Sequence, residues 1–250
     1  MRRRLAMLGD AGTSLVELMV SMLILGVILA STVTLAIGFE RTTAQNTARQ
    51  DQLESARVAS ERMARTVRTA VKPSQLTSCS LTGCAVDAFI SGSGLSMSFY
   101  ANFDNPRNSI GPRRVSYTVA TTGADAGVLI EKMQVPDSPI PTSSGYAYCN
   151  ADSPGATAAC RARVTTTRLA SGVRTSGTRG VFTYYDDAGS EIPLASGTSL
   201  TSAQLARVLA LELTVVVQSD SPTRPGPTTY IQRVTLPNAQ AVMRLEGTGP

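Results

Sequence analysis

The sequence predicts an α+β fold in which one long N-terminal helix packs on an antiparallel β-sheet domain. Apolar residues are concentrated in one stretch near the N-terminus, and no proline occurs between residues 13 and 72. After Pro73 the spacing of apolar residues changes from a helical period to the period of two that is typical of strands. The 250 residues therefore indicate one modest globular domain joined to a single long helix.

The first part of the predicted helix, residues 13–38, is a candidate membrane span. Residues 15–37 carry a single ionisable side chain, that of Glu17. At a rise of 1.5 Å per residue this stretch makes a helix of about 35 Å, against a hydrocarbon core of about 30 Å. Arg2, Arg3 and Arg4 precede it, so the positive-inside rule predicts that residues 1–12 are cytoplasmic. We therefore expect a single-pass protein of the cell membrane with an extracytoplasmic domain.

Residues 39–72 are predicted to continue the helix as an amphipathic segment. Small and apolar residues recur there at intervals of three or four, and they are Leu53, Ala56, Ser60, Met63, Val67 and Ala70. This spacing predicts a half-buried helix that packs on its own domain. Because the residue before a proline disfavours the helical conformation, the helix is expected to end at Pro73.

Residues 73–250 are predicted to form a β-rich globular domain. Apolar side chains alternate with polar ones over residues 95–99, 115–119 and 211–217, which is typical of antiparallel strands with one covered face. Residues 127–135, 181–185 and 229–236 are further strand candidates, and residues 199–208 can form one or two helical turns. Asp186 to Gly189 has the composition of a turn, which predicts a hairpin over residues 181–194.

Composition excludes several classes of function. The chain has no histidine, which excludes Ser-His-Asp and Cys-His catalytic sites and imidazole metal ligands. We therefore expect a protein that is not an enzyme and that uses no cofactor. The net charge of +5 is concentrated beside the apolar stretch, because residues 73–250 hold 13 basic and 12 acidic side chains. Direct nucleic-acid binding by the globular domain is therefore not expected.

The N-terminal sequence GDAGTSLVELMVSMLILGVILA resembles the type IV prepilin signature, a short basic leader that ends in Gly before a hydrophobic helix with Glu as its fifth residue. The resemblance implies that prepilin peptidase cleaves between Gly12 and Thr13 and methylates the new N-terminus. It also implies that Glu17 docks the subunit by pairing with the terminal amine of a neighbour. A buried carboxylate and a buried ammonium are each costly alone and tolerable together.

The resemblance implies a pilin-like fold and a structural role in a filament. The chain would be a minor pilin or pseudopilin of a type IV pilus or a type II secretion-like filament, at the cell surface or in the periplasm. Its partners would be other pilin or pseudopilin subunits, prepilin peptidase, the filament assembly platform and the membrane. The remainder of the chain is loosely similar to J-type minor pseudopilins. Many major pilins carry a proline in the hydrophobic helix, so its absence here favours a minor subunit.

Two alternatives remain for the N-terminal segment. An ordinary secretory signal peptide would have an apolar region of about 7–15 residues, shorter than the stretch found here. The second alternative is a single-pass, membrane-anchored extracellular adhesin or sensor that does not polymerise. The sequence does not choose between a pilus, a secretion system and a competence filament.

Four cysteines, Cys79, Cys84, Cys149 and Cys160, lie in the predicted extracytoplasmic domain. An even number there favours two local disulfides, Cys79–Cys84 and Cys149–Cys160, although three pairings are possible. A four-cysteine zinc site is the competing interpretation, and the spacing lacks the usual short gap in both halves. Asp186 and Asp187 could serve as calcium ligands or simply as turn residues. We predict no metal site.

Overall fold

A computed structural model of the chain describes residues 14–76, 87–142, 145–175, 180–218 and 226–236. Its long helix α1 spans Leu15–Val67. The chain divides into two compact units, Met1–Thr47 and Ala48–Pro250, so the second half of α1 belongs to the same unit as the strands. One long N-terminal helix with an antiparallel β domain confirms the predicted α+β class.

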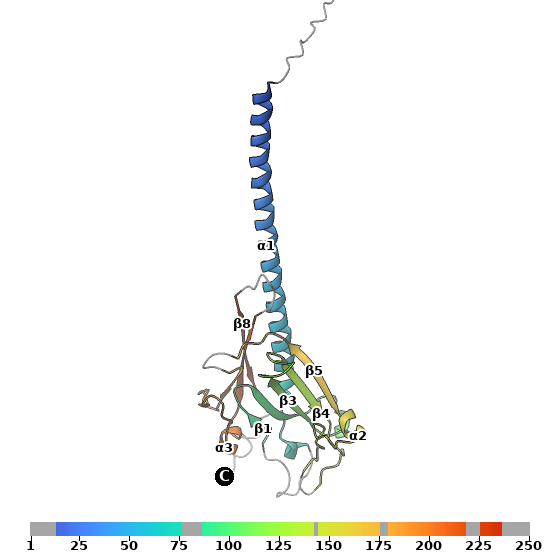
Figure 1. Ribbon diagram of the computed structural model, residues 1–250. Coiled ribbons are helices and arrows are strands. Elements are labelled where there is room, and N and C mark those ends of the chain that lie inside the picture. The colour runs from blue at the N-terminus through green and yellow to red at the C-terminus, as the bar shows by residue number, and fades with distance from the viewer. Residues whose placement is uncertain (1–13, 77–86, 143–144, 176–179, 219–225, 237–250) are drawn as a thin grey trace, which may run out of the picture. The chain divides into compact units, whose positions relative to one another are not determined.

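The strands of the second unit form two antiparallel sheets (Figure 1). The first sheet has five strands in chain order: β1 (Phe89–Gly92), β2 (Ser96–Ala101), β3 (Arg113–Val119), β4 (Leu129–Gln134) and β5 (Val164–Ala170). The second has three: β6 (Phe182–Tyr185), β7 (Ala210–Val217) and β8 (Thr228–Thr235). Short helical segments lie between them: η1 (Pro73–Gln75), η2 (Pro106–Asn108), α2 (Ala158–Ala162) and α3 (Ser202–Leu205).

The predicted strand alternation is confirmed in three strands. The alternating apolar residues of β2, β3 and β7 are at most 3% exposed, and they are Met97, Phe99, Val115, Tyr117, Val119, Leu211, Leu213, Val215 and Val217. They belong to one hydrophobic core together with the buried face of α1. Leu95, at the start of the predicted pattern, lies before β2 and is only half-buried.

The buried face of α1 differs from the predicted one at its start. Ala56, Ser60, Met63 and Val67 are buried as expected, but Leu53 is 47% exposed. Gln52 is buried instead, and its Oε1 accepts a hydrogen bond of 3.2 Å from Thr228 on β8. Further along, Arg62 bonds Glu131 on β4. This part of the helix therefore contacts both sheets.

Helix α1 ends at Val67 rather than at the predicted boundary before Pro73. The residues that follow pair with the end of β2: the Val71 N–H donates to the Tyr100 carbonyl at 2.9 Å, and the Asn102 N–H donates to the Thr69 carbonyl at 2.9 Å. These backbone bonds replace the helical ones. Lys72 is extended, with φ −73° and ψ 126°, as expected for a residue before proline.

The sequence prediction missed β1, β5 and α2. Strand β5, VTTTRLA, is rich in β-branched residues but has exposed side chains on both faces, so no apolar alternation marks it. The predicted hairpin is only partly formed. Its turn closes with a 3.0 Å bond from the Gly189 N–H to the Asp186 carbonyl, but the returning arm makes only the isolated bridge between Tyr185 and Glu191.

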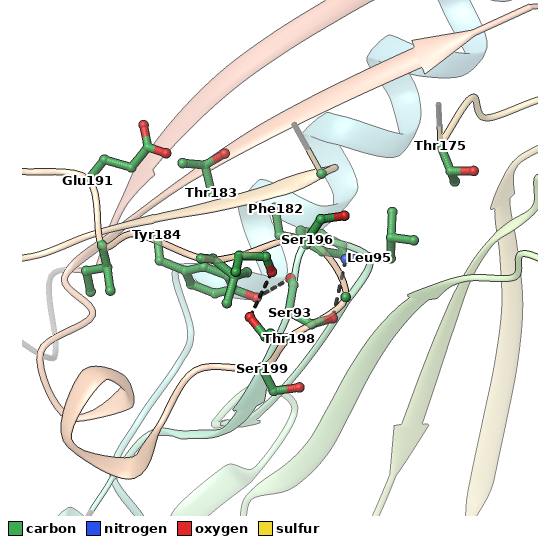
Figure 2. Close-up of a pocket in the computed structure, with 16 residues that line it drawn as sticks. Ser93, Leu95, Thr175, Phe182, Thr183, Tyr184, Glu191, Ser196, Thr198 and Ser199 are labelled. Carbon is green, nitrogen blue, oxygen red and sulfur yellow. Dashed lines mark hydrogen bonds between the residues drawn. The ribbon is translucent and has the colours of Figure 1, made fainter. Parts of the chain in front are cut away.

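Glycines allow the two sheets to approach closely. A Cβ atom on Gly180 would lie 2.3 Å from the carbonyl oxygen of Gly94, and one on Gly92 would lie 2.9 Å from the ring of Tyr184. Tyr184 on β6 donates its hydroxyl to the Ser93 carbonyl at 3.0 Å (Figure 2), and the Phe182 N–H donates to the Gly94 carbonyl at 3.1 Å, so hydrogen bonds also link the sheets at this point. Any larger residue at position 180 would force the backbones apart.

Candidate functional site

The first part of α1 is covered with exposed apolar side chains. Every large hydrophobic residue from Leu15 to Phe39 is between 45% and 76% exposed. Leaving apolar surface in water costs about 25 cal/mol per Å². The helix also contains a stretch long and apolar enough to cross a membrane, none of which is buried within the chain. This surface is therefore suited to lipid or to apolar helices of other chains.

The hydroxyl groups of this stretch are satisfied by the helix itself. Ser21, Ser31 and Thr34 donate to the backbone carbonyls four residues earlier, at 2.7, 2.8 and 2.7 Å. Thr32 donates to the Leu29 carbonyl at 2.9 Å. In hydrocarbon an unsatisfied polar group costs several kcal/mol, so these bonds adapt the segment to a water-free environment.

Glu17 lies in the first turn of α1 and is exposed. Its backbone N–H donates to the Ser14 hydroxyl at 3.3 Å, and its carbonyl accepts from Ser21. Its carboxylate makes no hydrogen bond or ion pair with any residue that the structure describes. The Ser14 hydroxyl therefore caps the first turn of the helix, a role that the sequence analysis missed, and the Glu17 carboxylate takes no part in this cap. The predicted docking role requires a positive charge from another chain.

A row of small residues was also missed, although its spacing is visible in the sequence. Gly26, Ala30, Thr34 and Gly38 follow one another at intervals of four, which places them along one side of the helix. Apart from the backbone of the helix itself, a Cβ atom on Gly26 or on Gly38 would meet no described atom within 4 Å. Small residues at this spacing allow helix backbones to approach one another in membranes.

The predicted processing site lies outside the described residues. Gly12 and Thr13 both belong to residues 1–13, of which the structure gives no description. Cleavage between them and methylation of Thr13 therefore stay predictions.

A buried carboxylate fixes the second part of α1 to the five-stranded sheet. Glu131 on β4 is 1% exposed. Its Oε2 accepts from Arg62 Nε at 3.0 Å and Arg62 Nη2 at 2.6 Å, and its Oε1 accepts from the Tyr117 hydroxyl at 2.7 Å. Burial, followed by the nearby Glu131 charge, raises the pKa of Tyr117 well above its ordinary value, so Tyr117 remains a neutral donor. The arrangement fixes the register of the helix on the sheet.

Cys149 and Cys160 form a disulfide, as predicted, with Cα atoms 6.0 Å apart. The bond joins the loop after β4 to α2, whose first turn is capped by Thr157 accepting from the Cys160 N–H at 3.1 Å. Gln134 of β4 donates to the Cys149 carbonyl at 2.7 Å and ties the same loop to the sheet. Cys79 and Cys84, the other predicted pair, lie outside the described residues.

Replacing both Cys149 and Cys160 with Ala is expected to destabilise the globular unit by about 2–3 kcal/mol, because the bond closes a short loop in the unfolded chain. Thermal unfolding followed by circular dichroism measures the effect. Thr157→Ala, which removes only the cap of α2, is the control and should cost about 1 kcal/mol. Equal midpoints for the double variant and the original chain would contradict this role for the bond.

Asp186 is used as a turn residue. One carboxylate oxygen accepts from the N–H groups of Ala188 and Ser190 at 3.1 and 2.9 Å, and the other accepts from Arg207 at 2.7 Å. Both oxygens therefore have partners within the chain. Among the described residues no cluster of three or more acidic or cysteine side chains is placed to hold a metal ion.

A pocket of about 250 Å³ lies where the two sheets meet, between residues 93–95, strand β6 and residues 191–199 (Figure 2). Hydroxyl groups line it, but those of Ser93 and Thr198 make hydrogen bonds to nearby backbone groups of the chain. The Ser93 hydroxyl accepts from the N–H groups of Leu95 and Ser96, and Thr198 donates to the Ala195 carbonyl. We interpret this pocket as part of the junction between the sheets.

Comparison of the chain with protein-family models, curated proteins and solved structures finds no match. The structure itself has a pilin-like architecture, with one long apolar N-terminal helix and an antiparallel sheet packed on its second part.

Proposed function

We propose that the chain is a structural, non-enzymatic subunit of a type IV filament, a minor pilin or pseudopilin. Prepilin peptidase cleaves it between Gly12 and Thr13. The apolar part of α1 first anchors the subunit in the membrane and then packs among the helices of other subunits. The β domain lies outside the membrane and selects the neighbouring subunits.

The main support is the first part of α1, whose apolar side chains are exposed and whose hydroxyls bond to its own backbone. Such a helix is suited both to lipid and to a bundle of helices. Glu17 distinguishes the two uses. A simple anchor supplies no positive partner for a carboxylate inside its apolar segment, where charged residues are costly, whereas a filament subunit can pair it with a neighbour's terminal amine.

Processing can be tested on the protein extracted from membranes of its native host. Mass spectrometry and N-terminal sequencing are expected to find a chain that begins at Thr13, with or without one added methyl group. Gly12→Val should prevent the cleavage, because prepilin peptidase is expected to require the small residue before the cleaved bond. Gly9→Val is the matched control in the same leader and should be processed normally.

The outcomes are distinct for each alternative. An intact Met1 would support a membrane-anchored adhesin or sensor that does not polymerise. A start beyond Ala30 would indicate an ordinary signal peptide. Either result would overturn the proposed filament role.

A further inference from the structure

The outward face of the five-stranded sheet carries a row of hydroxyl and amino groups. Strand register places Ser91, Ser98, Ser116, Lys132 and Thr166 directly opposite one another across all five strands. This face is opposite to the one that buries Phe99 and Tyr117, because successive side chains of a strand point to opposite sides. None of the hydroxyls of the three serines makes a hydrogen bond with a described residue. They remain available to a ligand.

A groove of about 190 Å³ follows this row. We call it the outer groove and define it by Ser98, Arg114, Ser116, Lys132, Gln134 and Asn150. The sheet forms its floor, and the loop closed by the Cys149–Cys160 disulfide forms one wall. The groove is smaller than the 300–1,000 Å³ typical of sites for drug-sized ligands, so it suits a single small unit of a larger molecule.

Arg114 is held in place at this groove without a carboxylate partner. Its guanidinium lies 5.2 Å from the centre of the Tyr148 ring and donates to Gln134 Oε1. Gln134 is only 4% exposed, and the Tyr148 hydroxyl donates to the Pro112 carbonyl at 2.6 Å, so both supports are themselves fixed. Among the described residues, no carboxylate lies within ion-pair distance of Arg114. A positioned, unpaired guanidinium matches the planar geometry of a carboxylate.

Lys132 supplies a second positive charge. It pairs with Asp152 at 2.7 Å, but the Asp152 side chain is 78% exposed. Exposed ion pairs contribute little, because water screens them, so a ligand anion can compete for Lys132. The groove therefore presents two cations and a row of free hydroxyls to an incoming anion. Its one acidic lining residue, Asp152, is the exposed partner of Lys132.

We propose that the outer groove binds one carboxylate-bearing sugar unit of an acidic polysaccharide. Arg114 and Lys132 bind the carboxylate, and the serines bind the hydroxyls of the sugar ring. A sugar unit fits better than an acidic peptide side chain, because that side chain supplies only a carboxylate, whereas the sugar also brings ring hydroxyls for the free serines. The apolar C–H face of the sugar ring can contact Ile90 and Val164, which also line the groove. The site lies on the globular unit, so it does not depend on the proposed filament role.

Calorimetric titration of the full chain in detergent micelles tests the proposal, with a linear galacturonate trimer as the probe and a neutral galactose trimer of the same linkage beside it. We expect the acidic trimer to bind and the neutral one to bind at least tenfold more weakly. Arg114→Gln is expected to weaken acidic-trimer binding by tenfold or more, as is typical for a lost charged hydrogen bond. Lys132→Gln, which removes a charge already paired with Asp152, should weaken it severalfold.

Arg113→Gln is the matched control. It removes the same charge from the neighbouring residue of β3, whose guanidinium lies 5.0 Å from the ring centre of Phe103 instead. This variant should bind the acidic trimer as the original chain does. Equal losses for the Arg113 and Arg114 variants, equal binding of both trimers, or no binding of the acidic trimer would overturn the proposal. Binding of an acidic peptide in place of the trimer would assign the groove to a protein partner.

Discussion

Glu17→Gln is expected to leave the chain in the membrane and to lower its recovery in sheared filaments by about tenfold or more. The substitution removes the charge and keeps the shape of the side chain, so the apolar helix remains able to insert. In a bundle of helices the terminal amine of a neighbour would lose its counter-charge, and removing one partner of a buried ion pair is strongly destabilising. A tenfold loss needs only 1.4 kcal/mol. Immunoblots of the filament and membrane fractions of the native host measure the ratio.

Two controls separate docking from helix capping. Glu40→Gln neutralises the acidic residue at the other end of the apolar stretch, and it should leave filament recovery unchanged. Ser14→Ala removes the hydroxyl that accepts from the Glu17 N–H but keeps the carboxylate. If Ser14→Ala lowers recovery as much as Glu17→Gln does, capping of the helix explains the effect. Normal recovery of the Glu17 variant would contradict the docking role.

The strand interiors could be predicted because alternation is a local property. Val115, Tyr117 and Val119 are buried as their period of two requires. The start of the buried helix face was predicted wrongly because that face consists of small residues, which hydropathy separates poorly from polar neighbours. Gln52 is buried through its bond to Thr228, far away in the chain, and nothing near Leu53 in the sequence indicates this.

The polar contacts of the fold could not be predicted from local sequence patterns either, because they join residues that are far apart in the chain. Glu131 lies on the buried face of β4, and its spacing of two residues from the apolar Leu129 could have predicted this position. Its partner Arg62, however, is 69 residues away, and only the folded chain brings the two together. The outer groove likewise depends on the register between strands. Sequence alternation predicts which face a residue occupies, but not which residue lies opposite it on the next strand.

Glu131→Ala is expected to destabilise the globular unit by about 2–3 kcal/mol, because it removes the acceptor of the buried Tyr117 hydroxyl. It also removes the counter-charge of Arg62, whose side chain is 42% exposed and can be rehydrated. For a unit of this size the midpoint of thermal unfolding should fall by about 10 °C. Circular dichroism of the full chain in detergent micelles measures both. The second part of α1 should lose its register on β4 first, because Arg62 joins helix and strand through this carboxylate.

Glu61→Ala is the control, since it removes a glutamate of α1 whose partner Arg57 is exposed. It should leave the midpoint almost unchanged, because exposed ion pairs contribute little. The double variant Arg62→Met, Glu131→Leu replaces the pair with apolar side chains and should be more stable than Glu131→Ala alone, as neither charge is then left unpaired. If Glu131→Ala and Glu61→Ala shifted the midpoint equally, Glu131 would not anchor the helix, and packing of Met63 and Val67 alone would hold it on the sheet.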